Sequence, residues 1–75
     1  MDEHLKQTIA NELNVHPAEL TSDKQLSDFD VWDSVMVLIV MMHISQAVEK
    51  EILPEEMASV RTFGDLESLV ASKRS

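Results

Sequence analysis

Residues 30–42, with the sequence DVWDSVMVLIVMM, decide the fold of this 75-residue chain. Acidic residues precede Ser34, and the fourteen residues after it carry no formal charge. A polar segment that ends in Asp-Ser and leads into an apolar run is typical of a helix N-terminus, with Asp33 as the N-cap residue. The sequence therefore predicts a helix from Ser34 to about Lys50. Its first turn would display the Ser34 hydroxyl without a base beside it, which favours an attachment point over a nucleophile.

Helical spacing divides the apolar residues of this segment between two faces. The stripe expected to face the core consists of Val37, Leu38, Met41, Ile44 and Val48. The face expected to lie away from it holds Met36, Ile39, Val40 and His43. Because an exposed apolar patch marks an interaction site, we expect a docking face for partner proteins that includes Val35, Met36, Ile39 and Val40.

Two more helices are predicted at the ends of the chain. Leu5, Ile9 and Leu13 recur every four residues, which predicts an amphipathic helix from about Asp2 to Asn14. At the other end, Thr62-Phe63-Gly64-Asp65 has the capping-box spacing. The core stripe of this last helix is Phe63, Leu66, Leu69 and Val70.

Prolines mark the shorter elements. Pro17 favours a helical turn through Leu20, and Pro54 a short helix through Val60. Residues 21–33 indicate a long loop whose apolar side chains, Trp32 among them, would pin it to the core. The predicted fold is an all-α, small antiparallel four-helix bundle with three longer helices and one short one, forming a single domain over residues 1–75.

Composition excludes several classes of protein. Fourteen acidic against six basic residues give a net charge of −8, which excludes nucleic-acid binding, and the absence of cysteine excludes disulfides and thiolate metal sites. The longest apolar run, residues 35–42, is far shorter than the roughly twenty residues needed to span a bilayer. The N-terminus has no signal-peptide pattern, so we expect a cytoplasmic location, or the stroma or matrix if a transit peptide has been removed.

No catalytic or metal-binding residues are predicted. Counted from Asp28, the sixth position of a calcium loop would be Asp33 instead of glycine and the twelfth would be Ile39, so an EF-hand is excluded. The three histidines are scattered along the sequence. A serine hydrolase is a poor interpretation, because no histidine adjoins Ser34 and no glycine-rich elbow surrounds it.

Four motifs in order along the chain carry a family resemblance. They are Leu26-Ser27-Asp28-Phe29, Asp33-Ser34-Val35, Ile52-Leu53-Pro54-Glu55-Glu56 and Arg61-Thr62-Phe63-Gly64-Asp65-Leu66. Together with the first amphipathic helix, they resemble the acyl carrier protein family, including its peptidyl and aminoacyl carrier domains. The resemblance covers nearly the whole chain.

The resemblance implies that Ser34 receives 4′-phosphopantetheine from coenzyme A through a phosphopantetheinyl transferase. The chain would then be a monomeric carrier, not an enzyme, that holds acyl or aminoacyl groups as thioesters. It would present them to acyl-activating, acyltransferase or synthase enzymes. Asp33 could also orient the transferase or its metal, and Trp32 could cover the base of the arm instead of anchoring the loop.

Departures from the family pattern favour a specialised carrier. Val35 replaces the usual leucine, and Val31 and Trp32 make the loop before Ser34 bulkier. The exposed face of the second helix lacks the acids common in carriers of fatty-acid synthesis, which favours a specialised fatty-acid, polyketide or related pathway. The alternative is an unmodified helical adaptor that uses its apolar second helix to bind another protein.

Overall fold

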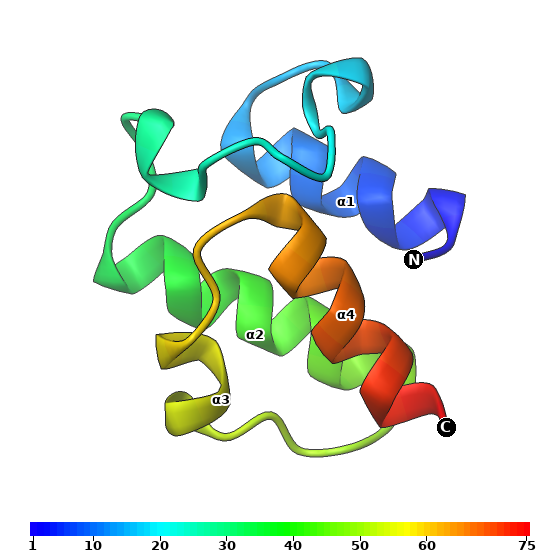
Figure 1. Ribbon diagram of the computed structural model, residues 1–75. Helices are drawn as coiled ribbons and strands as arrows, with labels where there is room; N and C mark the ends of the chain where they lie inside the picture. The colour runs from blue at the N-terminus through cyan, green and yellow to red at the C-terminus, as the bar shows by residue number, and fades with distance from the viewer.

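The computed structural model describes residues 1–75 and is all-helical (Figure 1). In chain order its elements are α1 (Glu3–Leu13), the 3-10 helices η1 (Pro17–Glu19) and η2 (Leu26–Asp28), α2 (Ser34–Val48), α3 (Pro54–Ala58) and α4 (Phe63–Arg74). There is no strand, only an isolated bridge between Gln25 and Thr62. The predicted bundle of three longer helices and one short helix is confirmed. No helix has both the length and the apolar character needed to cross a membrane.

The helix starts are fixed by local side-chain caps, of which the sequence predicts the one at α4 and not the one at α1. Asp2 accepts the Leu5 N–H at 2.8 Å and begins α1, which ends at Asn14 in the left-handed conformation. At α4, the Thr62 hydroxyl accepts the Asp65 N–H at 3.1 Å, and the Asp65 carboxylate accepts the Thr62 N–H at 3.1 Å. The capping box therefore forms in both directions.

Two helices end earlier than the sequence predicts. The last residue of α2 is Val48, and Glu49 follows it in the left-handed region with φ 57°, which terminates the helix before Lys50. In α3 the last residue is Ala58. The N–H of Val60 bonds to the carbonyl of Met57 at 3.0 Å, a three-residue turn that leaves the α-helical ladder.

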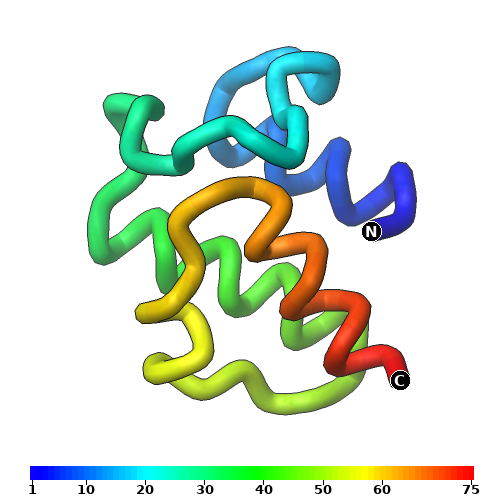
Figure 2. The backbone as a smooth tube through the Cα atoms, viewed as in Figure 1, coloured from blue at the N-terminus to red at the C-terminus, as the bar shows by residue number.

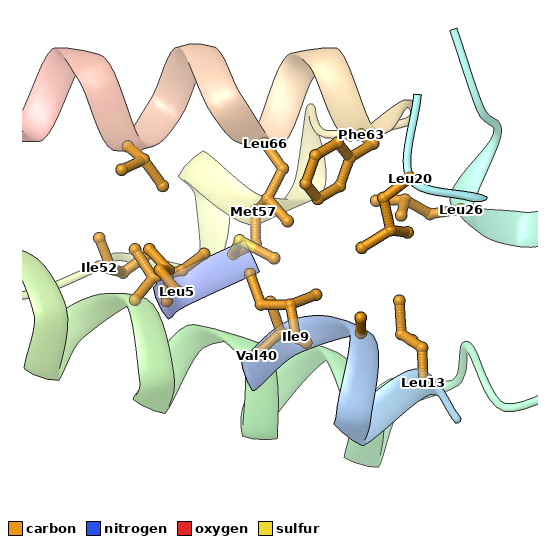
Figure 3. Packing of buried hydrophobic residues seen from close by; sticks show 13 residues of the cluster. Leu5, Ile9, Leu13, Leu20, Leu26, Val40, Ile52, Met57, Phe63 and Leu66 are labelled. Carbon is orange, nitrogen blue, oxygen red and sulfur yellow. The ribbon is translucent and has the colours of Figure 1, made fainter. Parts of the chain in front are cut away.

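The core is built from thirteen buried apolar side chains, shown in Figure 3. They are Leu5, Ile9, Ala10, Leu13, Leu20, Leu26, Val40, Ile44, Ile52, Met57, Phe63, Leu66 and Val70. Every α-helix contributes, and Leu20 and Leu26 come from the connection between α1 and α2. A core that draws on all elements fixes their relative positions.

The predicted core face of α2 is partly wrong. Leu38, assigned to the core, is 61% exposed, whereas Val40, assigned to the docking face, is 0% exposed and lies within the cluster of Figure 3. Val37, Met41 and Val48 are half-buried against the core, as is Met36 from the predicted docking face. The reason is that residues 35–42 are all apolar, so spacing alone does not reveal which side of the helix faces inward.

The connection between α1 and α2 is held against the start of α4 by main-chain hydrogen bonds. Leu26 N–H donates to Arg61 at 3.0 Å, Phe63 N–H to Lys24 at 2.9 Å, and Gly64 N–H to Ser22 at 2.9 Å. Figure 2 shows the two segments running side by side. Together with buried Leu26, these bonds fix the segment that leads to Ser34.

Candidate functional site

Ser34 is exposed and occupies the first position of α2. Its hydroxyl makes no hydrogen bond within the chain, because Asp33 supplies the cap. The Asp33 carboxylate accepts the Met36 N–H at 2.8 Å, and its carbonyl accepts the Val37 N–H at 2.9 Å. The predicted N-cap role of Asp33 is confirmed, and the Ser34 hydroxyl is left free for chemistry.

The first turn of α2 also leaves backbone donors free. The N–H groups of Ser34 and Val35 have no acceptor within the chain, and they lie at the positive end of the α2 dipole. Free N–H groups at a helix N-terminus suit a phosphate ester. The residues present therefore fit the phosphodiester through which 4′-phosphopantetheine would be attached.

The segment that leads to Ser34, which we call the acidic approach, carries three carboxylates. Asp28, Asp30 and Asp33 are all exposed, and Lys24 is the one basic group paired with any of them, 4.0 Å from Asp28. This end of the molecule is therefore acidic, which favours partners with basic side chains.

An apolar groove of about 380 Å³ begins at Ser34 and runs between α2 and α3. Its other lining residues are Val37, Leu38, Met41, Pro54, Met57 and Ala58. Figure 1 shows α3 beside α2, close to the end at which α2 begins. A groove lined almost entirely by apolar side chains suits an alkyl or acyl chain and offers little to a charged group.

A second apolar surface lies on the exposed side of α2. Val35, Leu38 and Met42 are 63%, 61% and 49% exposed, and their spacing of three and four residues places them on one face. Ile39 is half-buried at its border. We call Val35, Leu38 and Met42 the α2 stripe. Of the residues predicted for the docking face, Val35 belongs to this stripe, whereas Val40 is buried and cannot be part of an exposed surface.

The remaining residues singled out in the sequence lie elsewhere or have structural roles. Trp32 is half-buried against the core, which supports the loop-anchor interpretation. His16 caps η1 by accepting the Ala18 N–H, and His43 lies 3.3 Å from Glu12. No group of three metal-ligating side chains comes together in the structure.

Three carboxyl groups have lowered pKa values because they accept hydrogen bonds, two of them chiefly from backbone N–H groups at helix starts and one chiefly from a lysine. Backbone N–H groups of Arg61 and Thr62 lower the pKa of Asp65, and the Leu5 N–H does the same for Asp2. The hydrogen bond from Lys73 lowers the pKa of Glu56, with a further contribution from the Leu53 N–H. These charges stabilise the bundle and supply no acid or base to Ser34.

Comparison with known proteins decides what kind of molecule this is. Residues 3–70 match the sequence model of a family described as phosphopantetheine attachment site. The chain belongs to this family. Its members are non-catalytic carriers with covalently attached 4′-phosphopantetheine, so the chain is a carrier and not itself an enzyme. Carrier domains of this kind interact with synthase and transferase enzymes.

One curated relative is the non-reducing polyketide synthase rads2 of Floropilus chiversii, 40% identical to this carrier over 60 residues. The matched stretch makes up 80% of this chain and 3% of that protein. The carrier thus corresponds to a very small part of a much longer relative.

Sequence reasoning missed two parts of the carrier's surface. The α3 side of the groove, Pro54, Met57 and Ala58, gives no sequence signal, because only the packing of α3 against α2 creates it. Leu38 and Met42 were not assigned to the docking face. Their signal was present in the all-apolar character of residues 35–42, which provides one face for the core and another for solvent.

Proposed function

We propose that Ser34 is the residue that carries 4′-phosphopantetheine, and that this carrier holds acyl intermediates of a polyketide-type pathway. The observation on which the proposal depends is the free Ser34 hydroxyl. It is exposed at the start of α2, bonded to nothing, and beside a helix cap that Asp33 provides alone. The similarity to a polyketide synthase supports the choice of pathway.

When bound, 4′-phosphopantetheine supplies the terminal thiol on which acyl groups are held as thioesters. The chain's own residues would bind the phosphate of this group and shield its cargo. The N–H groups of Ser34 and Val35 would face the phosphate, and the groove between α2 and α3 would hold the apolar part of a cargo. Because no general base adjoins Ser34, its proton would pass to a base of the transferase. The Ser34 oxygen would form the new bond to phosphorus, and adenosine 3′,5′-bisphosphate would leave as the diphosphate bond of coenzyme A breaks.

The partners would dock on the α2 stripe and the acidic approach to Ser34. The stripe offers apolar contact, and the carboxylates of Asp28, Asp30 and Asp33 would meet basic side chains on the phosphopantetheinyl transferase, acyltransferase or synthase. Leu38 borders both the stripe and the groove, so a docked partner would lie next to the cargo.

Intact-mass spectrometry tests the assignment of Ser34. The chain is incubated with coenzyme A and a broad-specificity phosphopantetheinyl transferase, next to Ser34→Ala and to Ser27→Ala. Ser27 is a matched control, since it is another exposed serine whose hydroxyl bonds to nothing. We expect a mass gain of one phosphopantetheinyl group in the native chain and in Ser27→Ala, and none in Ser34→Ala.

A mass gain in Ser34→Ala would overturn the assignment, because another side chain would then carry the group. If the native chain gains no mass while a known carrier is modified in the same reaction, the proposal fails for this transferase. A panel of dedicated transferases would then show whether Val31, Trp32 and Val35 restrict recognition.

A further inference from the structure

The short helix α3 forms one side of the groove yet has few means of staying in place. Five residues are too few for a helix to be stable on its own. Two buried side chains hold this region, Met57 within α3 and Ile52 before it. The remaining residues of α3 are exposed or half-buried.

The junction between α3 and α4 is not filled by apolar packing. An open hollow of about 360 Å³ lies between them at the surface, lined by Glu56, Ser59, Val60, Asp65, Ser68 and Leu69. Four of these six residues are polar. Beyond the buried core around Met57, apolar contact between the two helices is therefore sparse, and a polar interaction can fix their separation there.

The interaction that spans this junction is an ion pair. Lys73 of α4 places its ammonium 2.8 Å from Oε2 of Glu56, and Oε1 of the same carboxylate accepts the Leu53 N–H at 2.9 Å. Glu56 thus caps α3 and joins it to α4 with its two oxygens. The side chains are only 21% and 26% exposed, so solvent screens this pair less than the 40% and 46% exposed pair of Arg74 and Asp2.

We propose that the Glu56–Lys73 ion pair is the positioning contact that holds α3 in place and so keeps the groove beside Ser34 closed on its α3 side. Neither residue lines the groove, so both act through Pro54, Met57 and Ala58. That the ion pair holds α3 in place, the positional part of the proposal, concerns the unmodified chain. Its consequence for cargo rests on the proposed function.

Amide hydrogen exchange of the unmodified chain tests the positional part. Lys73→Met keeps the aliphatic stem and removes the charge, and Glu56→Gln keeps an oxygen to accept the Leu53 N–H. Arg74→Gln is the matched control, because it removes a neighbouring charge of the same helix whose partner is Asp2, the N-cap of α1. Exchange is followed at the Met57 and Val60 amides, which bond within and just after α3, with amides of α1 and α2 as reference.

We expect exchange at Met57 and Val60 to rise about three- to fivefold in Lys73→Met and Glu56→Gln, the size that loss of one solvent-accessible ion pair allows. The reference amides should not change, and Arg74→Gln should leave α3 as it is. Unchanged exchange in both Lys73→Met and Glu56→Gln would overturn the proposal. An equal rise at every amide would also overturn it, since the pair would then stabilise the whole bundle without positioning α3.

The consequence for cargo is tested by methyl NMR of methionine after loading Ser34 with an octanoyl-phosphopantetheine group. Met41 and Met57 line the groove, whereas Met42 lies on the α2 stripe and serves as an internal control. We expect loading to shift the Met41 and Met57 signals in the native chain and in Arg74→Gln, and to shift them less in Lys73→Met. Equal shifts in all three would refute the effect on the groove. Failure to load at all, seen by mass, would instead refute the assignment of Ser34.

Discussion

Replacing Val40 with alanine removes two methyl groups from a side chain that is 0% exposed. At about 0.8 kcal/mol for each buried methyl-sized group, the transfer term is about 1.6 kcal/mol, and the cavity left behind adds to it. We expect Val40→Ala to lower the free energy of unfolding by about 2–3 kcal/mol. For a chain of this size that is a melting temperature lower by about 10–20 °C.

Leu38→Ala is the matched comparison on the same helix. Leu38 is 61% exposed, so only about two fifths of a full leucine burial energy is lost, about 0.5–1 kcal/mol. Urea unfolding followed by far-UV circular dichroism measures both variants. The same Leu38→Ala chain should be modified by the transferase or acylated by its partner less efficiently, because the α2 stripe loses its central side chain.

The opposite order of stabilities would refute this reasoning. If Leu38→Ala cost more than about 2 kcal/mol while Val40→Ala cost less than about 0.5 kcal/mol, the inward face of α2 would be the one predicted from sequence spacing. The docking surface would then return to Val40.

Three other predictions concern the backbone and the caps. A Cβ at Gly64 would lie 2.7 Å from the Ser22 carbonyl oxygen, so Gly64→Ala should lower the free energy of unfolding, measured in urea, by about 1–3 kcal/mol. An unchanged urea concentration at half-unfolding would contradict this close approach. Glu49 has φ 57°, a backbone conformation that strains any residue with a side chain, so Glu49→Gly should raise the free energy of unfolding by about 0.5–1 kcal/mol. A lower free energy of unfolding in the same urea assay would count against this strain. Hydrogen bonds hold the pKa of Asp65 below its ordinary value of 3.8 and the pKa of Glu56 below its ordinary value of 4.5. The stability that each ionised carboxylate contributes is therefore fully present above its ordinary pKa, and it is lost as the pH falls through the lowered pKa of the folded chain. The free energy of unfolding of the native chain should therefore fall below about pH 4.5, and it should fall less in Asp65→Asn. The same decrease in both chains would exclude Asp65 as a cause of the loss of stability in acid.

The features that the sequence predicted well are local ones. Asp33 and the pair Thr62 and Asp65 each bond to an N–H three residues away, so the order of residues is enough to identify them. The same holds for the position of Ser34 at the first turn of α2. Local hydrogen bonding in the candidate site therefore follows directly from the chain.

Features that depend on distant contacts could not be predicted in the same way. The inward face of α2 is decided by what packs against it, because an all-apolar stretch does not show which side of the helix faces the core. Phe63 and Gly64 donate main-chain hydrogen bonds to the carbonyls of Lys24 and Ser22, and such groups are present in nearly every residue. Gly64, where a side chain would not fit, is the only residue type that indicates these bonds in the sequence. The groove likewise exists only once α3 has packed against α2.

The unbonded Ser34 hydroxyl has a consequence for what an inactive version of this carrier would do. Because the hydroxyl contributes no bond to the fold, its removal leaves the Asp33 cap, the α2 stripe and the acidic approach unchanged. A Ser34→Ala chain would still be recognised by every partner that reads those surfaces, and would occupy them without delivering anything. Added in excess to a reconstituted pathway, it would act as a competitive decoy, and the degree of inhibition would rank how strongly each enzyme depends on the carrier's surface and how strongly on its cargo.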